Sequence, residues 1–190
     1  MKQRPLTGVI LAGGMGLRVG GVDKGLMELD GAPLVQYAVE LIKPYVDATV
    51  IIANRSLSAY EQFAHFVYTD KDAGYEGPLV AMATALQHST TEWNLFLPCD
   101  TPYLSNAIIE ALIAASHTHL DANVVVAHDE VRLQPLVCLV HKRTLPSLER
   151  FLSEGGRKVA SWQFSQNCEV VQIVGQQSAF RNLNTPDDFC

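Results

Sequence analysis

The segment VILAGGMGLRVGGVDKG (9–25) has the composition of a loop that handles phosphate. An apolar run, 9–12, leads into a stretch that holds six glycines and two cations, Arg18 and Lys24. Glycines let backbone N–H groups approach a phosphate closely. An arginine adds a bidentate fork and a lysine a point charge. This combination favours a phosphate-binding loop over a mobile glycine-rich surface loop.

The loop matches neither of the two common glycine motifs. The dinucleotide fingerprint G-x-G-x-x-G fails at its last position, where Val19 stands, and Asn54 replaces the acidic residue expected after the second strand. The ATPase loop needs Ser or Thr after its lysine, but Lys24 is followed by Gly25. A nicotinamide-dependent oxidoreductase is therefore disfavoured.

Asp100 is the candidate metal ligand, because it directly follows the apolar run LFLPC. Magnesium prefers hard oxygen ligands and takes one or two carboxylates together with phosphate oxygens. The alternative is an aspartate that caps the turn at Thr101. Cys99, beside Asp100, is interpreted as a small buried residue and not as a nucleophile.

The elements that must position these residues alternate between strand and helix in the first half of the chain. Short apolar runs predict strands at 9–12, 48–54, 65–70, 93–100, 123–128, 133–141 and 169–175. Amphipathic spacing predicts helices at 33–45, 56–63, 77–88, 105–117 and 145–155, with Ser56 and Ser105 as caps. The pattern predicts one α/β domain over 1–190, three layers (α/β/α) around a mostly parallel, Rossmann-like sheet. Ligands bind at the carboxyl edge of such sheets, where we expect Gly13, Gly14, Asn54, Asp70 and Asp100.

Bulk properties exclude several classes of protein. The net charge of −6 argues against broad nucleic-acid binding, which needs many cations facing phosphates. The four cysteines form no C-x-x-C pair, so the sequence indicates neither a zinc site nor a disulfide framework. No signal peptide and no apolar run near the roughly 20 residues that span a bilayer are visible. We therefore expect a cytoplasmic protein without a membrane partner.

Four segments resemble one family. LAGGMGLRVGGVDKGLMEL, YEGPLVAMATAL, FLPCDTPYL and NLNTPDDF are similar, in this order, to segments of nucleotidyltransferases with a GT-A-like fold, and most to molybdenum cofactor guanylyltransferases. Sugar nucleotidyltransferases and cytidylyltransferases typically place proline before the loop lysine, where this chain has Asp23. Molybdenum cofactor cytidylyltransferases usually have Leu-Ala-Ala-Gly, where this chain has Leu-Ala-Gly-Gly. The chain departs from the family at Gly16, Val19 and 20–22.

The resemblance implies an enzyme that transfers GMP from GTP to molybdopterin. Pyrophosphate leaves, and the product is the guanine dinucleotide form of the molybdenum cofactor. It further implies a Mg²⁺ cofactor, a monomer, and molybdopterin-handling proteins and acceptor molybdoenzymes as partners. Two alternatives stay open: a cytidylyltransferase or other small nucleotidyltransferase, and a GTP-binding protein that delivers cofactor without chemistry.

The resemblance also implies roles for individual residues. The backbone of Leu11, Ala12, Gly13 and Gly14 would lie along the guanosine, and Lys24 and Arg18 would hold the phosphates. Asp100 would bind the metal, Asp70 the nucleoside, and Asn182 and Asn184 the cofactor substrate. For Asn54, a contact with the base or ribose and a structural role in a turn are equally expected. For Asp70, capping of a turn is the alternative to binding the nucleoside. Arg157 and Lys158 would either meet the molybdopterin phosphate or be ordinary surface.

Overall fold

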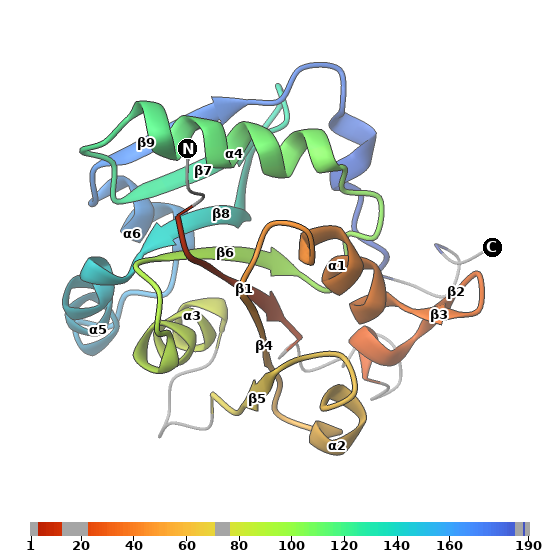
Figure 1. Cartoon of the computed structure of the whole chain (residues 1–190). Coiled ribbons are helices and arrows are strands. Elements are labelled where there is room, and N and C mark those ends of the chain that lie inside the picture. The colour runs from red at the N-terminus through yellow and green to blue at the C-terminus, as the bar shows by residue number, and fades with distance from the viewer. Residues whose placement is uncertain (1–3, 13–22, 71–76, 185–187, 189–190) are drawn as a thin grey trace.

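The computed structural model describes residues 4–12, 23–70, 77–184 and 188 (Figure 1). Its main sheet has seven strands in the order β5-β4-β1-β6-β8-β7-β9. β8 pairs antiparallel with both of its neighbours, and every other pairing in the sheet is parallel. The mostly parallel sheet predicted from the alternation of elements is therefore confirmed.

The strands of this sheet are β1 (Leu6–Leu11), β4 (Ala48–Ile52), β5 (Phe66–Tyr68), β6 (Trp93–Pro98), β7 (Val124–His128), β8 (Leu133–His141) and β9 (Cys168–Gln172). The α-helices are α1 (Leu34–Ile42), α2 (Leu57–Tyr60), α3 (Pro78–His88), α4 (Asn106–Thr118), α5 (Leu145–Ser153) and α6 (Val159–Phe164). The remaining elements are the hairpin β2 (Glu28–Leu29) and β3 (Ala32–Pro33), and the 3₁₀ turns η2 (Lys24–Leu26), η3 (Lys142–Thr144) and η4 (Gln177–Phe180).

Helices cover the sheet on both faces because its strands are apolar on both sides. In β1, Ile10 belongs to the cluster formed with α1, α2 and α4, whereas its neighbour Val9 belongs to the cluster formed with α3, α5 and α6. Both side chains are fully buried, and each contributes about 1.5–3 kcal/mol on burial. Gly8 lets α1 approach closely, since a Cβ there would clash with Ile42. β1 is thus a rigid central strand.

Helix starts differ in detail from the capping expected. Ser56 precedes α2 but has a left-handed backbone (φ 50°) and makes no capping hydrogen bond with its side chain. A side-chain cap requires an extended backbone at that position. Ser105 is extended, yet its hydroxyl donates to Gln176 Oε1 and accepts no hydrogen bond from the amides of the helix. Pro33 stands just before α1 instead of inside it, because it pairs with Glu28 in the hairpin.

Candidate active site

The carboxyl ends of β1, β4, β5 and β6 meet at one edge of the sheet, and their hydrogen bonding continues past the strands. The Ala12 amide donates to the Ile52 carbonyl (2.9 Å), and the Cys99 amide donates to the Leu11 carbonyl (3.2 Å). The backbone on either side of this edge is therefore fixed up to the residue before Asp100. A functional group placed here is held by a rigid element, as precise catalysis requires.

Asp100 is the centre of the polar contacts at this edge. Its Oδ2 lies 2.5 Å from Lys24 Nζ, and its Oδ1 accepts a hydrogen bond from Asn182 Nδ2 at 3.0 Å. The side chains of Asp100 and Lys24 are each 17% exposed, so the ion pair is partly shielded but reachable from solvent. Both oxygens of the carboxylate are thus oriented by neighbours, which fixes where its charge lies.

Lys24 connects the two sides of the site. Its ammonium donates to Asp100 Oδ2 and also to Asn184 Oδ1, at 2.6 Å. The lysine begins the short turn η2, which follows the glycine-rich segment directly. A cation held at this point is suited to neutralising phosphate charge, and this role of Lys24 stays a prediction.

The segment 182–184 closes the site from the far end of the sequence. Leu183 is fully buried against Leu29 and Leu34, and its amide donates to the Asp100 carbonyl at 2.9 Å. Side chains two residues apart in extended backbone point the same way. On either side of the buried Leu183, Asn182 donates to Asp100 and Asn184 accepts from Lys24. The structure brings together four residues predicted for the site, from three distant parts of the chain.

The other predicted nucleotide contacts divide into two groups. Leu11 and Ala12 lie at the buried end of β1, with the backbone hydrogen bonds given above. Asn54 Oδ1 accepts from the Asp70 amide at 3.2 Å, which ties the ends of β4 and β5 together and gives Asn54 a structural role. A contact of Asn54 or Asp70 with the nucleoside stays a prediction. Gly13, Gly14 and Arg18 lie outside the described residues.

Arg157 has a structural role beside the one predicted. Its guanidinium donates to the carbonyls of Leu152 and Gly156, at 3.2 and 2.7 Å, and so caps the end of α5. Basic side chains commonly satisfy the last carbonyls of a helix in this way. Arg157 and Lys158 are both exposed, and their contact with a substrate phosphate stays a prediction.

Tyr60 has no predicted role, yet it contacts both residues that flank Lys24. The Tyr60 hydroxyl donates to Asp23 Oδ1 at 2.5 Å, and Gly25 packs against the same hydroxyl. The signal in the sequence was the small residue after Lys24, which permits a close approach but does not identify what approaches. Tyr60 lies 37 positions from Asp23, beyond the reach of any local pattern.

The Cys99 thiol, beside Asp100 in the chain, is buried and a poor nucleophile. Burial raises its pKa to about 12, and the Asp100 carboxylate adds to the rise while Lys24 opposes it. The thiol therefore stays protonated near neutral pH, whereas the thiolate is the reactive form. Cys99 therefore has the properties of a packing residue.

We accordingly expect Cys99→Ala to retain turnover within about threefold of the wild type, since only a small buried group is lost. We also expect Cys99 of the folded protein to resist alkylation by iodoacetamide at pH 8, as followed by mass spectrometry. Initial rates of pyrophosphate release measure the first effect. Rapid alkylation together with loss of turnover would assign the thiol a chemical role.

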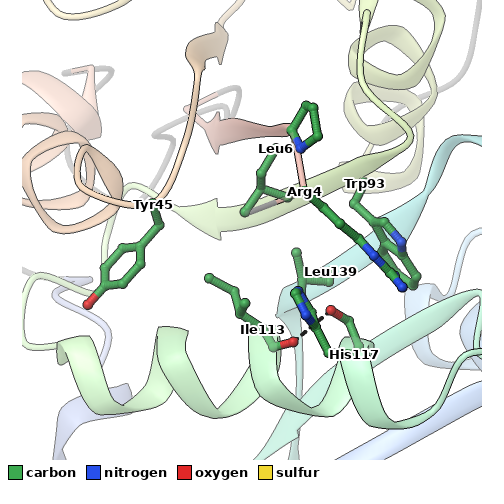
Figure 2. Close-up of a pocket in the computed structure, with 9 residues that line it drawn as sticks. Arg4, Leu6, Tyr45, Trp93, Ile113, His117 and Leu139 are labelled. Atoms are coloured by element: carbon green, nitrogen blue, oxygen red, sulfur yellow. Dashed lines mark hydrogen bonds between the residues drawn. The ribbon is translucent and has the colours of Figure 1, made fainter. Parts of the chain in front are cut away.

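A small, solvent-open cavity lies at the opposite edge of the sheet, where β1 and β6 begin. Figure 2 shows Arg4, Tyr45, Trp93 and His117 around it. None of the residues predicted for the site lines this cavity. Its residues therefore serve as controls remote from Asp100.

Metal-binding capacity at the site rests on a single carboxylate. Within the described ranges, no group of three or more His, Cys, Asp or Glu side chains could hold a metal ion by itself. Mg²⁺ is commonly held by one or two carboxylates together with phosphate oxygens of the substrate, so Asp100 fits such a site. In the same part of the chain, no helix has the length and apolar character needed to cross a membrane.

Comparison with known proteins identifies the family of the chain. Residues 8–168 match the model of the MobA-like NTP transferase domain. The chain is 41% identical over 182 residues to a molybdenum cofactor guanylyltransferase of Shewanella loihica, covering 96% of this chain and 92% of that one. A protein of the same name from Vibrio atlanticus is 41% identical over 180 residues, covering 95% and 91%.

The fold has its counterpart among solved structures. The molybdopterin-guanine dinucleotide biosynthesis protein A of Archaeoglobus fulgidus superposes with a TM-score of 0.76 at 22% identity, covering 96% of this chain and 94% of that one. This likeness establishes the fold, and the curated relatives establish the family. The chain therefore belongs to the MobA-like NTP transferase family of enzymes.

Proposed function

We propose that this enzyme transfers GMP from GTP to molybdopterin in the cytoplasm. The observation that carries the proposal is the Lys24–Asp100 pair at the carboxyl edge of the sheet, immediately after the glycine-rich segment. The two curated relatives described above bear the name of this activity and match over nearly their whole length. Molybdopterin-handling proteins and acceptor molybdoenzymes are the partners that this function implies.

The reaction is an in-line displacement at phosphorus. An oxygen of the terminal phosphate of molybdopterin forms a bond to the α-phosphorus of GTP. The bond from that phosphorus to the oxygen bridging to the β-phosphate breaks, and pyrophosphate leaves with the electron pair. Little covalent chemistry is required of the protein, so positioning and charge stabilisation supply the rate enhancement.

Lys24 would supply positive charge to the phosphates. Its ammonium donates hydrogen bonds to Asp100 and Asn184. A triphosphate offers stronger anionic acceptors at the same place, so we propose that the ammonium turns toward it while Asn184 keeps the side chain extended. The alignment set by Asn184 reduces the side-chain freedom lost when the nucleotide binds.

Asp100 would hold Mg²⁺ together with phosphate oxygens of the substrate. When bound, the metal would neutralise charge on the α-phosphate and the leaving group. Asn182 donates to one oxygen of Asp100 and thereby fixes the plane of the carboxylate. Asn182 and Asn184, held by the buried Leu183, would line the side of the site that receives molybdopterin.

A nucleotide-preference assay tests the proposal. Purified protein is incubated with molybdopterin, Mg²⁺ and GTP, CTP or ATP, and pyrophosphate release is followed. We expect release with GTP only, and none when molybdopterin is omitted. Release with CTP in place of GTP would assign the chain to the cytidylyl branch. Calorimetric binding of GTP without turnover, given a competent acceptor, would instead support a cofactor-delivery protein.

A further inference from the structure

We infer that Tyr60 is a positioning residue for Lys24 and acts through Asp23 and Gly25, the two residues that flank the lysine. Tyr60 is the last residue of α2 and is fully buried. Its hydroxyl contacts Asp23 on one side of Lys24 and Gly25 on the other. One side chain thus fixes the backbone on both sides of the lysine that contacts Asp100.

The contact with Asp23 is a hydrogen bond from a neutral phenol to a carboxylate. Asp23 is 9% exposed, and its Oδ1 accepts from the Tyr60 hydroxyl at 2.5 Å. Its Oδ2 is buried and has no hydrogen-bond partner among the described residues. Burial and the neighbouring Asp23 raise the pKa of Tyr60 well above its ordinary value, so the hydroxyl stays a donor. A buried carboxylate that lost this donor would have to move toward solvent.

The contact with Gly25 is a close packing of backbone against the hydroxyl. A Cβ at Gly25 would overlap the Tyr60 oxygen, so only glycine allows η2 to lie this near. The Leu26 amide then donates to the Asp23 carbonyl at 3.0 Å, which closes the turn around Lys24. Because the turn is short and anchored at both ends, a shift of Asp23 would be transmitted to the lysine side chain.

Two other groups near the Tyr60 hydroxyl act on its pKa in opposite directions. The charge of Arg55 opposes the rise of the Tyr60 pKa, whereas Cys99 contributes to it. Tyr60 thus connects α2 to the turn that carries Lys24.

The kinetic test of this inference rests on the proposed function, and it uses Tyr60→Phe with Tyr45→Phe as control. We expect Tyr60→Phe to lower kcat for GMP transfer by about 10- to 100-fold, with KM for molybdopterin changed by less than about threefold. The Tyr45 hydroxyl also donates to a carboxylate, Glu110, but in an exposed position beside the remote cavity, so Tyr45→Phe should match the wild type. Leu139→Ala, which destabilises the buried core near that cavity, shows what loss of stability alone does to kcat.

A second test needs no turnover. Lysine amines are acetylated with limiting acetic anhydride, and modification at each lysine is quantified by mass spectrometry. We expect acetylation of Lys24 to rise at least about fivefold in Tyr60→Phe and in Asp23→Ala, because release of the anchor frees its ammonium. Acetylation of the exposed Lys43 should not change.

The two tests separate the possible failures. If the wild type releases no pyrophosphate with any nucleotide, the proposed function fails, and the acetylation of Lys24 alone decides the role of Tyr60. If Tyr60→Phe leaves both kcat and Lys24 acetylation unchanged, the inference is overturned. The inference is also overturned if Tyr60→Phe lowers kcat only as much as Leu139→Ala does at the same melting temperature, and acetylation of Lys24 does not rise.

Discussion

Asp100→Ala is expected to lower GMP transfer by on the order of 10³-fold while the protein stays folded. The variant removes the carboxylate that would hold Mg²⁺ and leaves Lys24 without its anionic partner. The loss should fall on kcat, because charge stabilisation at the reacting phosphate acts mainly in the transition state. Initial rates of pyrophosphate release over a range of GTP and Mg²⁺ concentrations measure it.

Two companion variants separate charge from shape at this position. Asp100→Asn keeps an oxygen for the Asn182 hydrogen bond but loses the charge, so we expect it to be nearly as impaired as the alanine variant. Asp121→Ala removes an exposed carboxylate at the turn between α4 and β7 and should retain wild-type rates. Full activity of Asp100→Ala, with its circular dichroism unchanged, would remove Asp100 from the mechanism.

Lys24→Met is expected to reduce kcat/KM for GTP by on the order of 10²-fold or more. Methionine preserves much of the apolar stem but cannot donate to Asn184 or to a phosphate. The variant also leaves Asp100 unneutralised in the free enzyme, and this repels the triphosphate in addition to the lost attraction. Calorimetric titration with GTP and Mg²⁺ should show weaker binding alongside the slower turnover.

Lys43→Met is the matched control for that experiment, because Lys43 is exposed after the end of α1 and lies outside the site. It should bind GTP as the wild type does. If Lys24→Met bound GTP with unchanged affinity and turned it over at the wild-type rate, the lysine would be a structural partner of Asp100 and nothing more.

The central strands were predictable because their burial on both faces imposes continuous apolar runs. β1 and β6 satisfy this condition and were found to within a few residues. The helix α6 was not predicted, since its six residues carry no capping signal and too few turns for a period to show. The hairpin of β2 and β3 was also missed, because two residues per strand are too short for alternation to be seen.

The residues of the site were predictable as types, and their contacts were not. Asp100 and Lys24 stood out by their position after an apolar strand and a glycine-rich segment. Asn182 and Asn184 entered only through the family resemblance, because their partners lie 82 and 160 positions away. Tyr60 lies inside the helix predicted at 56–63, and only the packed structure shows what its hydroxyl contacts.

The hydrogen bond between Lys24 and Asn184 spans 160 positions of sequence. Chains are synthesised at about 5–20 residues per second, so roughly 8–32 s separate the addition of the two residues on the ribosome. During that interval a nascent chain carries the loop and the lysine without the amide that orients its ammonium. We therefore expect competence for the reaction only after Asn184 has been added, when every strand of the sheet that carries the site has been made.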